Sequence, residues 1–423
     1  MPPVYSACMT DATDRQLAAQ YETFPYPRRD PRDEARRLIV GSPGHLREID
    51  YWIFGARRPA ALPLRALYAG GGTGDGTLML AQQMASAGRA GSVTWLDRSA
   101  AALQIAQARA AARGLSNIVW ESRSLLDLPD AGLGEFDYVD CCGVLHHLPD
   151  PAEGLRALTS VLAPGGGLGL MVYAPHGRTG VYMVQDALRL LAPAGEAPPA
   201  ARLDMARRVM RHLPETAWLR QNRFLDDHVN GGDAGLFDLL LNPRDRAYTV
   251  PQFSSLLAEA GLRVECWVEP LRYDPLFWLP DPKLRARAEA LDPTARAALA
   301  EALAGNINAH IVYCVRAEAP VERADPMAPE AMPVGREVTG EQLAGYIQPD
   351  GALTMAFDGL RARIPLPAMA PAILRLVDGQ RTVGEIGATL AARGSNTEAF
   401  ARAWRATFTA LQHVNRLLLA APA

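Results

Sequence analysis

A glycine-rich stretch followed by an acidic turn is the part of the chain best suited to ligand binding. One apolar run ends in Gly70-Gly71-Gly72-Thr73-Gly74, and the next, Ser92 to Leu96, ends in Asp97. Glycines let a backbone approach a ligand closely, and the helix that follows offers free N–H groups at its start. In a nucleotide site built from alternating strands and helices, a carboxylate at the second strand end meets the ribose hydroxyls. The pattern therefore predicts a nucleoside-binding site.

Two further motifs follow at wider spacing. Residues 135–151 read EFDYVDCCGVLHHLPDP, and residues 162–171 read LAPGGGLGLM. Gly-Gly-Thr-Gly lacks the G-x-G-x-x-G spacing of a pyrophosphate site. In this order and at these separations, the motifs resemble those of the class I S-adenosylmethionine-dependent methyltransferases. That pattern comprises a glycine-rich first motif, an acidic second strand end, an "FDxV…LHHL" fourth strand and an "L-x-PGG" turn. The resemblance is close over residues 60–175 and looser to about residue 316.

The resemblance implies S-adenosyl-L-methionine as the cofactor. Two positions depart from the family pattern. Tyr68 stands where the family usually has an acidic residue, so an indirect contact to the methionine amino group is missing or replaced. Ser124 stands where an Asp often meets the adenine amino group. The cofactor-binding residues expected are Ala69, Gly70, Gly71, Gly72, Thr73, Gly74, Asp97, Arg98, Ser124, Leu125, Cys142 and Gly143.

Methyl transfer from a sulfonium demands mainly alignment and exclusion of water, and it requires no metal. A general base is needed only where the acceptor arrives protonated. His146 and His147, together with Cys141 and Cys142, also suggest a metal site. An adjacent histidine pair projects to different sides, and the family carries a similar pair without metal, so we expect none. The candidate catalytic residues are His146, His147 and Tyr26, with Tyr173, His176 and His228 as further candidates by position.

Alternating apolar runs and helical stretches predict the elements that position these residues. We expect an α/β fold with a Rossmann-like, doubly wound, mostly parallel seven-stranded sheet and helical insertions. Strands are expected at about 65–69, 92–97, 117–121, 136–142, 167–174 and 262–268, with a closing antiparallel strand at 308–316. Helices are expected at about 75–88, 99–113 and 151–162, and Thr249 or its neighbour should cap another.

The N-terminal 60 residues should form an arm or lid ahead of the first strand. Residues 1 to about 15 are polar and are expected to be loose, and helical stretches should include Leu38, Ile39 and residues 46–53. Pro25 and Pro27 exclude a helix between these parts. The lid candidates are Tyr21, Phe24 and Tyr26, for which simple packing onto the domain is an equally expected role.

A methyltransferase-like domain is expected over residues 61–316. Its helical insertions, about 176–247 and about 281–304, lie above the carboxyl ends of the sheet, where ligands bind. The longer insertion is the expected acceptor-recognition element.

Residues 317–335 carry four prolines and no periodicity, which predicts a linker. Residues 336–423 should then form a small α+β, winged-helix-like C-terminal domain with a hairpin around Asp358-Gly359 and three helices. Within it, ILRLVDGQRTVGEIGATL resembles small winged-helix-like modules, including PqqD-like peptide-binding ones. The resemblance spans about 50 residues and makes this part a candidate for binding a partner.

Composition excludes several classes of partner. The 423 residues carry 43 basic and 46 acidic side chains, a net charge of −3, so we expect neither nucleic acid nor membrane binding. The five cysteines show no C-x-x-C spacing, and no apolar stretch approaches 18 residues. We therefore expect a cytoplasmic protein.

Two alternatives to a methyltransferase remain open at this point. One is a binding protein that keeps the fold without catalysis, and Tyr68 and Ser124 favour it. The other is an NAD-dependent oxidoreductase, which the glycine spacing disfavours. The methyl acceptor, a small metabolite or a side chain of a peptide or protein, is not specified by the sequence.

Overall fold

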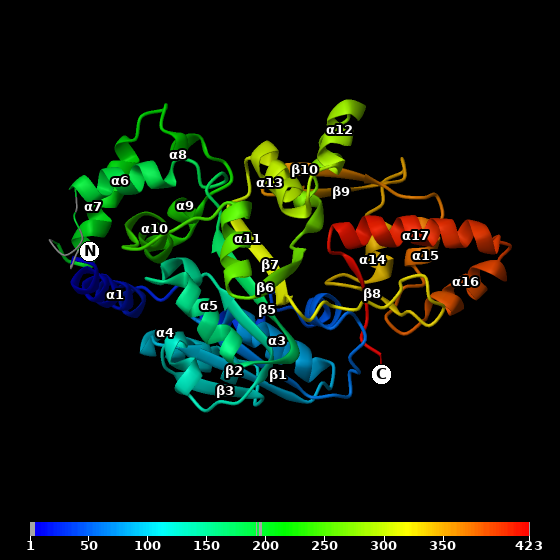
Figure 1. The fold of residues 1–423 in the computed structure, drawn as a ribbon, viewed down its shortest axis with the longest axis horizontal. Coiled ribbons are helices and arrows are strands. Elements are labelled where there is room, and N and C mark those ends of the chain that lie inside the picture. Colours follow the sequence, from blue (N-terminus) through cyan, green and yellow to red (C-terminus); the bar gives the residue numbers. More distant parts are fainter. Residues whose placement is uncertain (1–4, 192, 194–196, 423) are drawn as a thin grey trace.

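A seven-stranded sheet forms the centre of the molecule (Figure 1). The computed structural model describes residues 5–191, 193 and 197–422. The strand order is β3-β2-β1-β4-β5-β7-β6, and only β7, inserted between β5 and β6, runs antiparallel to its neighbours. The expected doubly wound, mostly parallel sheet is confirmed. Its strands are β1 Leu64–Ala69, β2 Gly91–Asp97, β3 Ile118–Ser122, β4 Phe136–Cys142, β5 Leu162–Tyr173, β6 Leu262–Trp267 and β7 Ala309–Arg316.

Helices cover both faces because strand side chains alternate between the two faces. Leu67 and Ala69 belong to the apolar core of one face, which includes residues of α5 (Pro151–Ser160) and α11 (Val250–Glu259). Ala66 and Tyr68 belong to the core of the other face, with α3 (Asp75–Ser86) and the π-helical turn η2 (Ile49–Ile53). Several helices begin at a residue whose side chain caps the first turn. Ser99 caps α4 (Ala100–Ala112), and Thr249 forms a capping box with Gln252, as expected.

The N-terminal arm differs from the expectation in two places. Residues 5–23 form the helix α1 (Tyr5–Thr23), so the loose segment predicted up to residue 15 is wrong over the described residues. Packing explains the difference, since Leu17 and Gln20 are buried against the domain. The helix ends before Pro25, as expected. Leu38 and Ile39 are not helical, and helix resumes only at α2 (Leu46–Glu48), after a 3-10 turn η1 (Pro31–Ala35).

The long insertion lies beside α1 in the view of Figure 1. Its helices share an apolar cluster of their own, which includes Val184, Leu203 and Phe237. Phe24 of the arm packs against this cluster, with its ring stacked on Phe237. The insertion comprises α6 Val181–Leu191, α7 Pro199–His212, α8 Trp218–Gln221, α9 Asp227–Asn230 and α10 Gly232–Leu241; the shorter one comprises α12 Pro282–Glu289 and α13 Pro293–Ala304.

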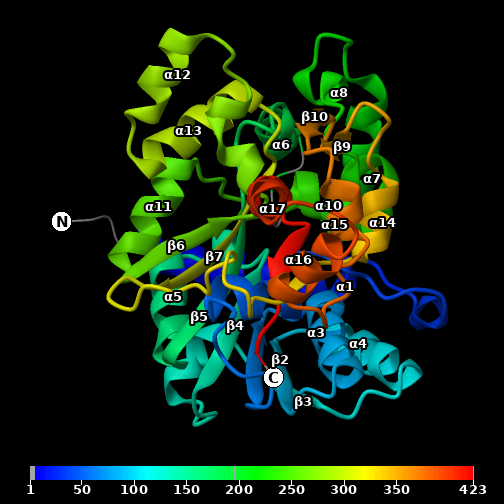
Figure 2. The same ribbon diagram turned by 90° about the vertical axis from the view of Figure 1, so that its right-hand side faces the viewer.

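The C-terminal elements pack at the opposite side of the molecule from α1 and α6 (Figures 1 and 2). A hairpin turns at Asp358-Gly359, whose positive φ angles of 47° and 84° suit a two-residue turn. Three helices follow the hairpin, as expected. The elements are β8 Pro333–Gly335, α14 Gly340–Gly345, β9 Ala352–Phe357, β10 Leu360–Pro365, α15 Ala370–Leu374, α16 Val383–Ala391, α17 Thr397–His413 and β11 Leu417–Leu419.

No break in the apolar core separates these elements from the sheet. One cluster runs from Trp52 and Tyr138 to Trp404 and Leu418. The proline-rich segment is packed as well, because the Trp404 indole donates to the carbonyl of Pro326 at 2.7 Å. The domain boundaries and the winged-helix resemblance remain predictions.

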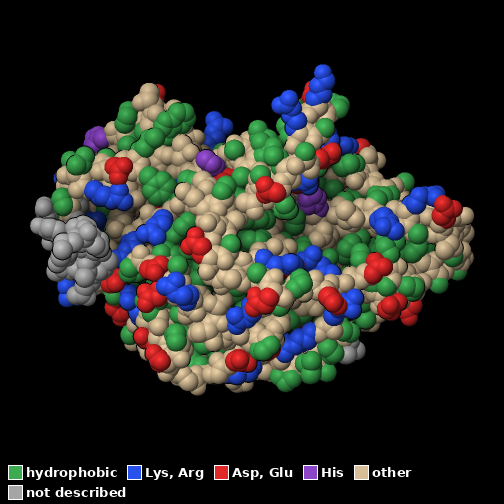
Figure 3. Space-filling view, in the orientation of Figure 1, with side chains coloured by type: hydrophobic (Ala, Val, Ile, Leu, Met, Phe, Trp, Pro, Cys, Tyr) green, Lys and Arg blue, Asp and Glu red, His purple; other side chains and the backbone are tan. Residues whose placement is uncertain are grey.

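The surface carries both signs of charge. Figure 3 shows Lys and Arg interspersed with Asp and Glu over the face in view. None of the helices in the described ranges has the length and apolar character needed to span a membrane.

Candidate functional site

The glycine loop is folded back onto the end of β2. The N–H groups of Gly70 and Gly71 both donate to the carbonyl of Leu96, at 2.7 and 3.0 Å. The Asp97 carboxylate then accepts the N–H of Gly72 at 2.9 Å on one oxygen and that of Ser99 at 3.0 Å on the other. Because each carboxylate oxygen can accept two hydrogen bonds, Asp97 keeps acceptor capacity for a ligand.

Three positions of this loop require glycine, two because of packing and one because of backbone conformation. A Cβ atom on Gly71 would overlap the Trp95 ring, and one on Gly70 would overlap Val144 just beyond β4. Gly72 has a φ of +49°, and a Cβ there would approach only the backbone carbonyl of Tyr26, at 3.3 Å. Gly70 and Gly71 therefore serve packing, whereas Gly72 presents bare backbone toward the N-terminal arm.

The other expected donor-site residues lie at the ends of the neighbouring strands. The Arg123 N–H donates to the Asp97 carbonyl at 3.1 Å, which places Ser124 beside the end of β2. Ser124 caps the 3-10 turn η3 (Leu125–Asp130), in which Leu125 is buried. On the other side of the loop, Cys142 is exposed and Gly143 has a φ of 76°. Arg98 is exposed at the surface.

A group of charged residues that the sequence reasoning missed holds the loop in place. Arg109, only 1% exposed, donates to the Thr73 carbonyl and to Asp75 at 2.7 Å each, and to Glu34 at 2.6 Å. Arg29 pairs with the same Asp75. An arginine inside the alanine-rich stretch of α4 was the one sequence signal, because nothing local explains a cation there.

The N-terminal arm lies against the site. The Thr73 hydroxyl donates to the Pro27 carbonyl at 2.9 Å, and the Ser99 hydroxyl donates to Glu22 at 2.8 Å. Backbone of the arm therefore runs over the glycine loop, between α1 and η1.

A cluster of phenols surrounds a buried carboxylate between the arm and the insertion. Asp238 of α10, 4% exposed, accepts hydrogen bonds from Tyr21 at 2.8 Å and from Tyr173 at 3.1 Å. Asn242 donates to the same carboxylate at 3.3 Å. Burial raises the pKa of Tyr21, Tyr173 and Tyr26, with further raising from Asp238. These phenols stay protonated near neutral pH and can act as hydrogen-bond donors.

The two adjacent histidines differ in their hydrogen bonding. His147 Nδ1 lies 2.6 Å from the carbonyl of Arg244. Since a carbonyl only accepts, the geometry assigns the proton to Nδ1 and leaves Nε2 with a free lone pair. His146 is fully buried, and its ring centroid is 4.0 Å from that of Tyr173. Neither of its ring nitrogens has a hydrogen-bond partner among the residues that the structure describes. Burial, and then His147 and Arg178, hold the pKa of His146 well below its usual range.

The remaining candidates lie apart from this arrangement. His176 is exposed beyond β5, and His228 lies on α9, half-buried. Burial lowers the pKa of His228.

Comparisons with known proteins identify related sequences and structures. Residues 67–168 match the model of a family described as "Methyltransferase domain". An uncharacterized protein from Synechococcus sp. is 32% identical over 305 residues, which cover 71% of each chain. The chain belongs to the methyltransferase-domain family.

Other relatives of this methyltransferase share only part of its length. The ubiquinone biosynthesis O-methyltransferase of Thiobacillus denitrificans is 35% identical over 137 residues, 32% of this chain and 53% of that enzyme. Among solved structures, PKMT2 from Rickettsia typhi in complex with AdoHcy superposes with a TM-score of 0.62 at 16% identity. The match covers 90% of this chain and 75% of PKMT2, so the similarity of fold extends beyond the sheet.

Proposed function

We propose that the chain transfers a methyl group from S-adenosyl-L-methionine to an acceptor bound between the arm and the longer insertion. The single observation that carries the proposal is the glycine loop clamped to Asp97 at the end of β2. The fit of the donor is supported by the loop itself, because Gly72 has no side chain to fill the space beneath the arm and Asp97 retains acceptor capacity. PKMT2, the structural neighbour with AdoHcy, supports the same assignment.

Each donor group has a proposed partner. Asp97 would accept both ribose hydroxyls, and the backbone around Ser124 and Leu125 would border the adenine. The glycine loop, Cys142 and Gly143 would border the methionine portion. The bound donor supplies an electrophilic methyl group on a sulfonium. The chain's own task is to align an acceptor with that group and to exclude water.

His147 is the proposed general base for an acceptor that arrives protonated. Both rings are buried, but the Nδ1–H of His147 donates to the Arg244 carbonyl and leaves its Nε2 lone pair available, whereas burial lowers the pKa of His146. The tyrosines, Tyr26 included, would donate hydrogen bonds to the acceptor. A His147→Asn variant should lower turnover by about a hundredfold while donor affinity changes little. Unchanged turnover would remove His147 from this role.

Calorimetry on the purified protein with S-adenosylmethionine beside NAD tests the donor. We expect the first to bind and NAD not to bind. Asp97→Ala should weaken donor binding by about tenfold or more, because charge-assisted bonds contribute about 1.5–3 kcal/mol. The matched control is Asp292→Ala, which likewise removes a carboxylate that accepts a backbone N–H, from the start of α13. Equal donor affinity in Asp97→Ala and wild type would reject the assignment.

The acceptor is the larger unknown. Incubating a cell extract with labelled donor and comparing intact masses would separate a metabolite from a peptide or protein. A protein that binds the donor and labels nothing would favour the alternative of a binding protein without catalysis.

A further inference from the structure

Asp140 is a buried carboxylate below the end of β4, next to the proposed donor site. It is 3% exposed and lies two residues before the exposed Cys142. Since alternate residues of a strand share a face, Asp140 and Cys142 point to the same side of the sheet. In the register of the sheet, Asp140 is paired with Tyr68 of β1, just before Gly70.

Phenols and a tight backbone turn surround this carboxylate. The Tyr138 hydroxyl donates to Asp140 at 2.7 Å, and the Tyr68 hydroxyl donates to the carbonyl of Gly44 at 3.2 Å. A Cβ atom on Gly44 would overlap the Tyr68 hydroxyl and lie 3.2 Å from Asp140 Oδ2. The segment around Gly44 therefore closes the far side of the carboxylate.

Asp140 has no cation beside it. Within residues 5–191, 193 and 197–422, no arginine, lysine or histidine forms an ion pair with it, and Tyr138 is the one side chain seen to donate to it. Burial raises the pKa of Asp140 to about 7, against the lowering effect of the Tyr138 hydrogen bond. Burying a carboxylate without a positive partner lowers the stability of the fold, and a cationic group bound next to it would offset that loss.

The strand order identifies which part of the donor would supply that cation. Asp97 and Ser124 lie on the β2 and β3 side of the glycine loop, whereas Asp140 lies on β4, on the other side of β1. A nucleoside held at β2 and β3 extends the rest of its chain across the loop toward β4. In S-adenosylmethionine that part is an amino acid with an α-ammonium group.

We propose that Asp140 binds the α-ammonium group of the donor. This inference rests on the proposed function, because it concerns the other end of the same ligand. It also gives the site a carboxylate on β4 where Tyr68 occupies the acidic position expected on β1. Asp140 would then select ligands that carry the amino acid over those that carry the nucleoside alone.

The test compares two ligands that differ in this group. Calorimetry on the full chain would measure S-adenosylhomocysteine and 5′-methylthioadenosine, which lacks the amino acid. Asp140→Asn should weaken the binding of S-adenosylhomocysteine by about tenfold or more and the binding of methylthioadenosine by less than about twofold. The matched control is Asp137→Asn, at the other end of the same strand, where the carboxylate accepts the Arg65 N–H. It should leave the ratio of the two affinities unchanged.

Wild-type protein provides a second measurement that does not depend on the variant folding. Protonation of Asp140 competes with ammonium binding below about pH 7. Affinity for S-adenosylhomocysteine should therefore fall about tenfold from about pH 8 to about pH 6, while the affinity for methylthioadenosine stays constant.

Equal losses for both ligands in Asp140→Asn, or no loss for either, would overturn the inference and leave the proposed function standing. A flat pH dependence in the wild type would overturn it as well. Wild-type protein that binds neither ligand would overturn the proposed function, and the inference with it.

Discussion

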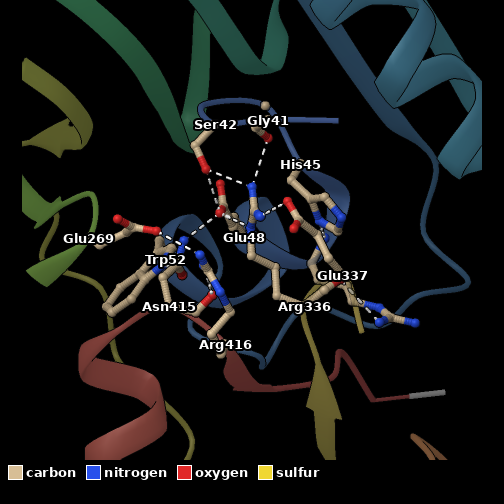
Figure 4. A network of polar contacts seen from close by, with 12 residues as sticks. Gly41, Ser42, His45, Glu48, Trp52, Glu269, Arg336, Glu337, Asn415 and Arg416 are labelled. Atoms are coloured by element: carbon tan, nitrogen blue, oxygen red, sulfur yellow. Dashed lines mark hydrogen bonds and ion pairs between the residues drawn. The ribbon is translucent and has the colours of Figure 1, made fainter. Parts of the chain in front are cut away.

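Two buried carboxylates on the same side of the sheet have opposite surroundings. Glu48 is fully buried and receives hydrogen bonds from Arg336, Asn415, Ser42 and Tyr313 (Figure 4). Asp140, 3% exposed, receives one from Tyr138. Burial by itself therefore does not distinguish a structural charge from a functional one. The two carboxylates also differ in their number of partners, and a buried carboxylate that is short of partners lowers the stability of the fold.

The Glu48 network joins the beginning of the chain to its end. Arg336 also donates to the Gly41 carbonyl at 2.9 Å, and the Trp52 indole donates to Asn415 at 3.2 Å (Figure 4). Together with the continuous apolar core, these contacts make the C-terminal elements part of one packed body with the sheet. Asp140 lies on the same side of the sheet but is not part of the Glu48 network.

Truncation near Ala328 should give the largest effect. It removes Arg336 and Asn415 from Glu48 and exposes one side of the apolar core, which includes Trp52 and Tyr138. We expect a loss of more than about 5 kcal/mol, comparable with the whole stability of many domains, and hence a protein that unfolds at low temperature. Thermal unfolding of the full and shortened chains checks this.

A shortened chain with wild-type stability would break the comparison. If such a chain kept its donor affinity but showed a raised Michaelis constant for the acceptor, the C-terminal part would act in recruiting the acceptor instead. If donor binding, acceptor kinetics and stability were all unchanged, both roles would be rejected.

Arg336→Met should give the next largest effect. It removes the cation and keeps most of the side-chain volume, so Glu48 stays buried with its charge uncompensated. The free energy of unfolding should fall by about 3–5 kcal/mol, measured by urea denaturation. The control is Arg381→Met, whose pair with Asp378 is largely exposed and should contribute less than about 1 kcal/mol. Similar losses in the free energy of unfolding of the two variants would show that the Arg336–Glu48 pair contributes no more than an exposed ion pair.

Much of the fold followed from local patterns in the sequence. Apolar runs of strand length, the glycine turn after β1 and caps such as Ser99 and Thr249 act within a few residues of one another. The mostly parallel seven-stranded sheet and its closing antiparallel strand were expected and are confirmed, whereas the order of the strands comes from the structure. Helix α1 was missed because its stability comes from burying Leu17 and Gln20 against distant elements, which no local pattern reveals.

Only part of the candidate site could be proposed from the sequence. Gly72 and Asp97, which the fold brings into contact, could be proposed because backbone shape and strand ends point to them. Arg109 and Glu48 could not, since their partners lie far away in the sequence, with Arg336 separated from Glu48 by 288 residues. Asp140 could not either, because its burial and its single donor, Tyr138, are visible only in the fold. A charged residue within an apolar run signals that a partner exists, and only the fold shows which partner it is, or that it is missing.

The smallest expected effect concerns the stability of the ligand-free protein, and it tests the cost of Asp140 directly. Its pKa of about 7 in the folded state lies above the value of about 3.9 in an unfolded chain. Between these values the folded protein binds more protons than the unfolded one, so stability falls as pH rises. The slope is at most about 1.4 kcal/mol per pH unit.

Asp140→Asn should remove this slope and leave the variant more stable than the wild type near pH 8. Urea denaturation of both proteins from about pH 5 to about pH 8 measures the difference. Asp50, whose pKa burial raises to about 6, contributes equally to both curves, so the difference isolates Asp140. Glu48→Gln is the matched comparison and should lower stability across the range, because its four donors are arranged for a carboxylate. If the curves of stability against pH for wild type and Asp140→Asn ran parallel, the charge of Asp140 would not lower stability. The contrast between Asp140 and Glu48 would then be wrong.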